Sequence, residues 1–167
     1  MTIDFTKASA MELAYGNRCA LKTVRPENVF RFPEGLLGFQ HIKEYVFILN
    51  DKVKPFMFMH ALDGSDMCFV CVESFMICPT YQIKLPDGLV SALEIETQED
   101  VLLLNLVTVR QKIEDISANM VSPIVINIKK RLGRQMIVEN SEFQMRYKIW
   151  DAIAKSDNGA ALASMAG

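Results

Sequence analysis

Short apolar segments rich in β-branched, aromatic and methionine side chains constrain this chain most strongly. Residues 45–49 and 56–62 are apolar at successive positions, which suits strands covered on both faces better than strands with one wet face. Residues 67–72 repeat this pattern, and we expect the β-rich run 101–109 to form a central strand. Polar turns that contain Asp, Asn, Gly or Pro separate these segments. Together they predict a meander of strands.

Turn residues also delimit shorter strands near the start of the chain. Residues 11–15 and 18–24 predict a hairpin around Gly16-Asn17, because Gly and Asn tolerate the positive φ of tight turns. Residues 28–32 predict a short third strand, which ends at Pro33 because proline lacks the N–H that a strand ladder needs.

A second hairpin is predicted near the other end. Residues 123–128 and 135–139 flank a polar segment in which Gly133 is expected to supply the turn. With about nine short strands and one or two short helices, the sequence predicts a mainly β fold, a small antiparallel β-barrel-like domain.

Helical signals are few. After the break at 86–88, Leu89, Ala92 and Leu93 recur at helical spacing and predict one short surface helix. Residues 97–100 resemble a helix-start capping motif, so we expect a single turn ahead of the central strand. Residues 141–155 allow a second helix, since several apolar side chains there fall near one face.

The length of 167 residues fits one domain. We expect residues 1–10 to form an N-terminal extension and residues 11–150 a single β-barrel domain. Residues 151–167 are rich in Ala and poor in large side chains, so they bury too little to offset the entropy of ordering and predict a mobile tail.

Composition excludes several classes of protein. Half of the residues are hydrophobic and 23% are charged, which is typical of a folded globular chain. The net charge of −2 provides no global excess of cations for a nucleic-acid backbone. The start of the chain lacks the pattern of a secretory signal, and no apolar run reaches the roughly 18 residues of a membrane span. We therefore expect a cytoplasmic protein with reduced cysteines.

No motif predicts catalysis, a cofactor or a metal site. Cys68-x-x-Cys71 lies in a predicted strand, without the second Cys/His pair that a zinc site needs, so both thiols are predicted to be buried packing groups. His41 and His60 accompany no nucleophile motif. Gly35-x-x-Gly38 lacks the third glycine of a dinucleotide-binding loop and predicts a turn.

Two charged clusters are candidate contact surfaces. The first contains Lys129, Lys130, Arg131 and Arg134 at a predicted hairpin tip, which leaves direct RNA binding as one hypothesis. The second contains Glu94, Glu96, Glu99 and Asp100, which we expect to be exposed and able to attract a basic partner. The alternative for both clusters is an ordinary solvated surface.

Four segments resemble one known family. Phe32-Pro-Glu-Gly-Leu-Leu-Gly-Phe39 is similar to the opening motif of the flagellar assembly factor FliW family. Residues 72–81, 99–109 and 119–127 resemble further family segments in the same order, with weaker agreement at 133–138 and 15–16. The resemblance extends over roughly residues 11–147.

This resemblance implies a small β-barrel protein without enzymatic activity. Family members bind flagellin and also bind the RNA-binding translational repressor CsrA. The implied mechanism is partner switching, in which export of flagellin frees the factor to capture CsrA, so that flagellin messenger RNA is released for translation. We expect no direct contact with nucleic acid or membrane and a monomer when free. A small-molecule or cofactor-binding β-barrel is the alternative, because small barrels can hold ligands in their mouths.

Overall fold

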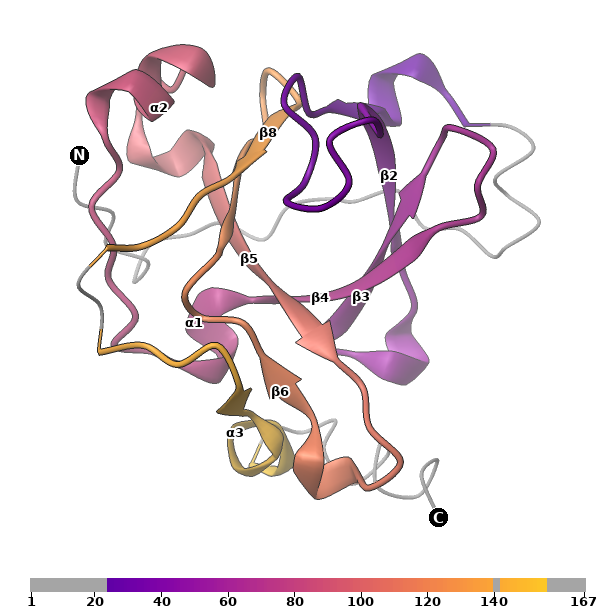
Figure 1. Cartoon of the computed structure of the whole chain (residues 1–167), viewed down its shortest axis with the longest axis vertical. Coiled ribbons are helices and arrows are strands. Elements are labelled where there is room, and N and C mark those ends of the chain that lie inside the picture. Colours follow the sequence, from indigo (N-terminus) through magenta and orange to yellow (C-terminus); the bar gives the residue numbers. More distant parts are fainter. Residues whose placement is uncertain (1–23, 140–141, 156–167) are drawn as a thin grey trace.

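A closed β-barrel forms the body of the protein. In the computed structural model, which describes residues 24–139 and 142–155, nine strands form one sheet in the order β4-β3-β2-β1-β8-β7-β5-β6-β9. The strands are β1 (Phe30–Arg31), β2 (Glu44–Leu49), β3 (Phe56–Ala61), β4 (Cys68–Glu73), β5 (Val101–Thr108), β6 (Ser117–Ala118), β7 (Ile124–Asn127), β8 (Leu132–Gln135) and β9 (Tyr147–Lys148). Because β4 also pairs with β5, seven strands close into a barrel, and β6 and β9 extend from the end of β5 (Figure 1). The expected mainly β, barrel-like fold is confirmed.

Both faces of the barrel wall are buried, which explains the continuous apolar runs. In β5, Leu102 and Leu104 belong to a cluster inside the barrel, whereas Val101 and Leu103 belong to a second cluster outside it. Each such side chain contributes roughly 1.5–3 kcal/mol when fully buried. Because strand side chains alternate between faces, one run of leucines supplies both clusters.

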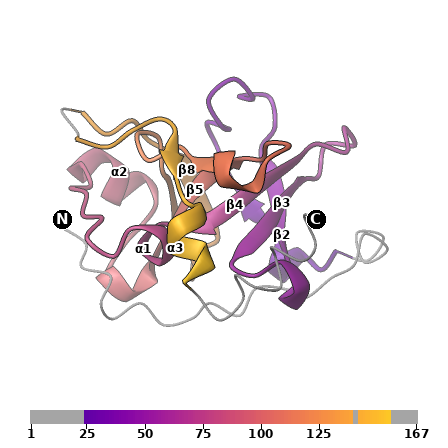
Figure 2. The ribbon, with the colours of Figure 1, turned by 90° about the horizontal axis from the view of Figure 1, so that it is seen from below.

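Three short helices cover the outer cluster. They are α1 (Ser74–Ile77), α2 (Asp87–Ala92) and α3 (Trp150–Ala154), and each buries one apolar side chain: Ile77, Leu89 and Ile153. Figure 2 shows the helices on the side of the molecule away from β2. The predicted surface helix after Pro86 is confirmed as α2, whereas α1 was not predicted. None of the described helices is long and apolar enough to cross a membrane.

The barrel interior is filled by side chains. Phe30 packs edge-on against Phe47 with ring centroids 5.0 Å apart, and Phe32 packs likewise against Tyr45 at 5.1 Å. All four rings are less than a tenth exposed. Edge-to-face geometry adds to the free energy of burial. The interior is therefore a packed core, which disfavours the alternative of a ligand held inside the barrel.

The first part of the described chain departs from the predicted all-antiparallel meander. The predicted strand 28–32 shortens to β1, because the 3₁₀ turn η3 (Pro26–Asn28) precedes it with proline at its first position. β1 then pairs in parallel with β8 through Arg31 and Leu132. This single parallel contact closes the barrel on that side. The hairpin predicted over 11–24 falls almost wholly outside the described residues, which begin at 24, and is not described.

Gly133 does not supply the turn of the second hairpin. It lies inside β8, and the left-handed turn residue is Arg131, with φ of 53°. A Cβ atom on Gly133 would lie 2.3 Å from the ring of Phe32. Glycine is required here because the Phe32 ring packs against the strand backbone. The prediction of a hairpin is confirmed, and its register was wrong.

The C-terminal region is less helical than the sequence allows. Residues 147–148 form β9 by pairing with β6, so the helix is confined to α3. Strand pairing removes Tyr147 from any helix, and Met145 is exposed. α3 crosses the domain boundary expected after residue 150 and buries Ile153 in the outer cluster. The expected tail therefore begins within a packed helix, and residues 1–10 and 156–167 lie outside the described residues.

Candidate partner-binding surface

The segment that follows α2 presents the acidic residues. The Ile95 N–H bonds the Val90 carbonyl at 3.0 Å and the Glu94 N–H bonds the Ser91 carbonyl at 3.1 Å, which is the pattern of a Schellman helix end. Glu94 occupies the left-handed position of this motif with φ of 52°, where glycine is usual. The helix end therefore turns the chain outward and exposes the side chains of Glu94 and Glu96.

Asp100 differs from the other three acids. It ends the 3₁₀ turn η5 (Gln98–Asp100), where its carboxylate accepts a hydrogen bond from the Thr97 N–H in a capping box. Its side chain is only 3% exposed and pairs with Lys129 Nζ at 2.5 Å. The Lys129 ammonium is the main cause that holds the pKa of Asp100 below its ordinary value. The expectation that Asp100 is exposed was wrong, because a buried cap holds η5 in front of β5.

The acidic and basic clusters singled out in the sequence lie against each other. Lys130 Nζ is 3.5 Å from a Glu94 oxygen and 3.9 Å from a Glu96 oxygen. These pairs are exposed and contribute at most about 1 kcal/mol each. Four carboxylates face two ammonium groups, so the surface stays net acidic. We call Glu94, Glu96, Glu99 and Asp100 the acidic surface. The segment between α2 and β5, which contains them, lies at the end of the molecule that also holds the β7–β8 turn (Figure 1).

This pairing weakens the hypothesis of RNA binding by the hairpin tip. Lys129 and Lys130 are bound to carboxylates, and Arg134 pairs with Glu34 at 2.9 Å. A cation that already neutralises a carboxylate must give up that partner before it can neutralise a phosphate.

Asn127 joins the two clusters, although sequence reasoning did not select it. Its Nδ2 donates to the carbonyls of Leu93 at 2.8 Å and Glu94 at 2.9 Å. Its Oδ1 accepts from the N–H groups of Lys129 at 3.0 Å and Lys130 at 3.1 Å. The only sequence signal is an asparagine placed just before a turn, where such side chains bond the backbone two and three residues on. One buried side chain therefore joins the backbones of the two clusters, in addition to the ion pairs between their side chains.

The turn over residues 33–39 lies beside β8. Gly35 has φ of +68°, and a Cβ atom there would lie 2.6 Å from the backbone of Gln40, so only glycine fits. The Leu37 N–H donates to Gln135 Oε1 at 2.9 Å, and the Leu37 side chain is 48% exposed. The turn thus presents an apolar side chain on a fixed backbone.

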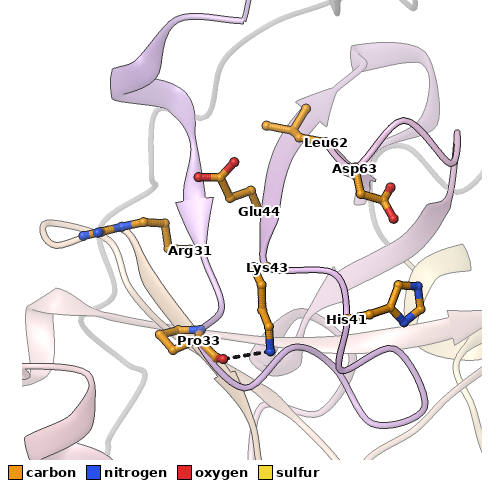
Figure 3. A pocket seen from close by; sticks show the side chains of 7 residues that line it. All are labelled: Arg31, Pro33, His41, Lys43, Glu44, Leu62 and Asp63. Carbon is orange, nitrogen blue, oxygen red and sulfur yellow. Dashed lines mark hydrogen bonds between the residues drawn. The ribbon is translucent and has the colours of Figure 1, made fainter.

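A pocket of about 340 Å³ lies between this turn and β2. Figure 3 shows Lys43 reaching the carbonyl of Pro33, a bond of 2.9 Å, with His41 and Asp63 at one side and Arg31 at the other. The Ser65 hydroxyl and N–H, as the largest causes, hold the pKa of Asp63 below its ordinary value. Because side chains of both charges line the pocket, it indicates neither a particular class of substrate nor one catalytic side chain.

The cysteine and histidine candidates separate in the fold. Cys71 points into the barrel, and burial raises the pKa of its thiol. Cys68 is exposed, contrary to the prediction that both thiols are buried, and its Sγ lies 3.3 Å from His60 Nε2. Residues three apart in a strand point to opposite faces, so the two thiols share no site. Among residues 24–139 and 142–155, no cluster of three or more His, Cys, Asp or Glu could hold a metal ion.

Comparisons with known proteins agree on one family. The family model described as FliW protein matches residues 15–149. The flagellar assembly factor FliW of Clostridium novyi (strain NT) is 34% identical over 75% of this chain and 88% of its own length. The protein of the same name from Desulfitobacterium hafniense (strain DSM 10664 / DCB-2) is 35% identical over 76% of this chain and 84% of its own. A crystal structure of the flagellar assembly factor FliW matches with a TM-score of 0.69 and 33% identity, covering 75% of this chain and 88% of that one. Sequence, fold and relatives together show that the chain belongs to the FliW family.

Proposed function

We propose that this chain is a non-enzymatic flagellar assembly factor that acts in the cytoplasm by binding other proteins. Family membership over residues 15–149 is the observation that carries the proposal, since relatives matched over most of their length bear that name. The packed barrel interior supports a role played by the outer surface. Such a protein assists flagellum biogenesis by binding one protein or another, and it catalyses no reaction.

The proposed partners are flagellin and the translational regulator CsrA. Flagellin that has not yet been exported occupies the factor, which acts toward it as a chaperone. When flagellin is exported, the free factor binds CsrA and relieves repression of flagellin translation. The cycle needs two binding equilibria that oppose each other through the same protein.

The acidic surface is the proposed contact for CsrA. A protein that binds RNA carries a basic surface, and a net acidic surface attracts it by complementary potential. Glu94, Glu96 and Glu99 are exposed and are the groups proposed to meet the partner, whereas Asp100 holds η5 in place from below. The exposed side chain of Leu37 is the alternative contact.

Charge reversal tests this contact. Changing Glu94, Glu96 and Glu99 to Lys should slow association with CsrA and weaken its salt dependence, while the free energy of unfolding stays within about 1 kcal/mol of wild type. The matched control changes Glu27, Glu139 and Glu142 to Lys, exposed acids outside the acidic surface, so the net charge changes equally. Stopped-flow association at low salt distinguishes the two variants. Equal rates for both would remove the acidic surface as the contact and direct attention to the turn 33–39.

Co-purification tests the function itself. The tagged chain, expressed in its own cells, should retain flagellin and CsrA through washing at moderate salt. Failure to retain either protein would refute the proposed function.

A further inference from the structure

A second charged surface lies at the opposite end of the molecule from the acidic surface. Its residues come from the β5–β6 connection, which includes η6 (Ile113–Asp115), and from the chain at β9. Figure 1 places this connection and β6 at the far end from α2. Pairing of β6 with both β5 and β9 brings residues 109–117 beside residues 146–148, although they are about thirty residues apart in the chain. Neither segment belongs to the clusters that the sequence singled out.

The surface forms a hollow of about 750 Å³ with strongly unbalanced charge, which we call the basic groove. Arg110, Lys112, Arg146 and Lys148 line it together with a single carboxylate, Asp115. Lys148 already pairs with Asp115 at 3.3 Å. No ion pair among the described residues involves the other three cations.

This arrangement contrasts with the basic hairpin tip. There, Lys129, Lys130 and Arg134 each have a carboxylate partner. In a chain with net charge −2, three gathered cations without such partners create a local positive potential that attracts an anionic group. Charge complementarity at the groove therefore favours an acidic ligand.

The groove also carries apolar area suited to a polypeptide. Val109 lines it and is 59% exposed. Protein-binding surfaces combine apolar contacts with a charged rim. None of the described residues that line the groove is aromatic, whereas surfaces that bind single-stranded nucleic acid usually stack bases on aromatic rings. These features favour an acidic peptide over RNA.

We propose that the basic groove binds an acidic, partly apolar polypeptide segment of a partner protein. Arg110, Lys112 and Arg146 neutralise its carboxylates, and Val109 contacts an apolar side chain between them. This site is separate from the acidic surface, so it does not depend on which protein occupies that surface. A protein with two surfaces of opposite charge at its two ends can contact one basic and one acidic segment.

Binding is tested with the full chain and a fluorescein-labelled peptide of alternating Glu and Leu. The peptide should raise fluorescence anisotropy at low salt, and added salt should reduce the affinity. A peptide with Gln in place of Glu and a twelve-nucleotide polyuridine are the two comparison probes. Failure of the Glu peptide to bind, or tighter binding of polyuridine, would overturn the proposal.

Matched variants locate the site. Changing Lys112 and Arg146 to Glu should weaken peptide binding by about tenfold or more. The control changes Lys52 and Arg31 to Glu, which alters net charge equally at exposed positions outside the groove. An equal loss of peptide affinity in both variants would show that the peptide is attracted by overall charge and not by the groove, and would overturn the proposal.

A measurement on the unmodified protein keeps the test independent of variant folding. Amide signals of residues 109–117 and 146–148 should shift in nuclear magnetic resonance spectra when the Glu peptide is added. Shifts confined to other residues would place the peptide elsewhere and contradict the assignment.

Discussion

Replacement of Asn127 by Ala should destabilise the protein by about 3 kcal/mol. Of its four hydrogen bonds, the bond to the Leu93 carbonyl is fully buried, and an unpaired buried carbonyl costs about 1–3 kcal/mol. The bonds to the Glu94 carbonyl and to the N–H groups of Lys129 and Lys130 are partly accessible, so water replaces them at roughly 0.5 kcal/mol each. Asn127 itself is 1% exposed, which leaves little room for compensating water beside Leu93.

Urea unfolding followed by circular dichroism measures this loss. The midpoint should fall with an unchanged dependence on denaturant, because the surface exposed on unfolding is nearly the same. Asn50→Ala is the matched control: Asn50 Oδ1 accepts one bond, from the Lys52 N–H at the start of η4 (Asp51–Val53), and should cost about 1 kcal/mol. Hydrogen exchange at Lys129 and Lys130 should accelerate in the Asn127 variant only. A loss no larger than that of the control would refute the role of Asn127 in joining the two charged clusters.

Three further substitutions test the packing and the ion pair. Gly133→Ala should lower the free energy of unfolding in urea by about 1–3 kcal/mol, because the added Cβ meets the Phe32 ring. Gly88→Ala, with open space around the added Cβ, should be neutral or slightly stabilising. Equal effects of the two substitutions would contradict the packing of Phe32 against Gly133. Tyr45→Phe should leave thermal stability unchanged or raised, because no hydrogen bond among the described residues satisfies the buried Tyr45 hydroxyl. Tyr81→Phe should lose about 1 kcal/mol, because it removes the 2.7 Å bond from the Tyr81 hydroxyl to the Met120 carbonyl. A loss at Tyr45 as large as at Tyr81 would show that the Tyr45 hydroxyl has a hydrogen-bond partner. Lys129 holds the pKa of Asp100 below its ordinary value of about 3.9, so the stabilisation from this ion pair is present above that value and disappears as the pH falls through the lowered pKa. Asp100→Asn should therefore lose less stability than wild type between about pH 5 and pH 2. Parallel curves of stability against pH for the two proteins would exclude the ion pair as a cause of acid sensitivity.

The strands of the barrel could be predicted from local pattern. Residues 45–49, 56–62, 67–72 and 101–109 correspond to β2, β3, β4 and β5 within one or two residues at each end. Their runs are apolar on both faces, and this pattern can be recognised in the local sequence without knowing which strands pair. The single turn at 97–100 was also predictable, since a capping motif is local.

Features set by distant contacts could not be predicted. β6 and β9 are two residues long and exist because each pairs with a strand elsewhere in the chain. Gly133 carries a turn signal in the sequence, yet the Phe32 ring from another strand determines its role. Local propensity contains neither interaction.

The candidate surfaces show the same limit. The sequence identified the acidic and basic clusters as separate, while the fold places them in contact through Asn127 and buries Asp100 beneath the turn. The basic groove combines residues 110–112 with residues 146–148, so no single window of sequence contains it. Charge clustering becomes visible only after strand pairing is known.

Isothermal titration of CsrA into the purified chain, with and without saturating flagellin, tests the central proposal most directly. Partner switching predicts that the free chain binds CsrA and that flagellin lowers the apparent affinity, because opposing equilibria require a negative coupling between the two ligands. The reciprocal titration must show the same coupling. CsrA binding that is absent, or that is identical with and without bound flagellin, would contradict partner switching.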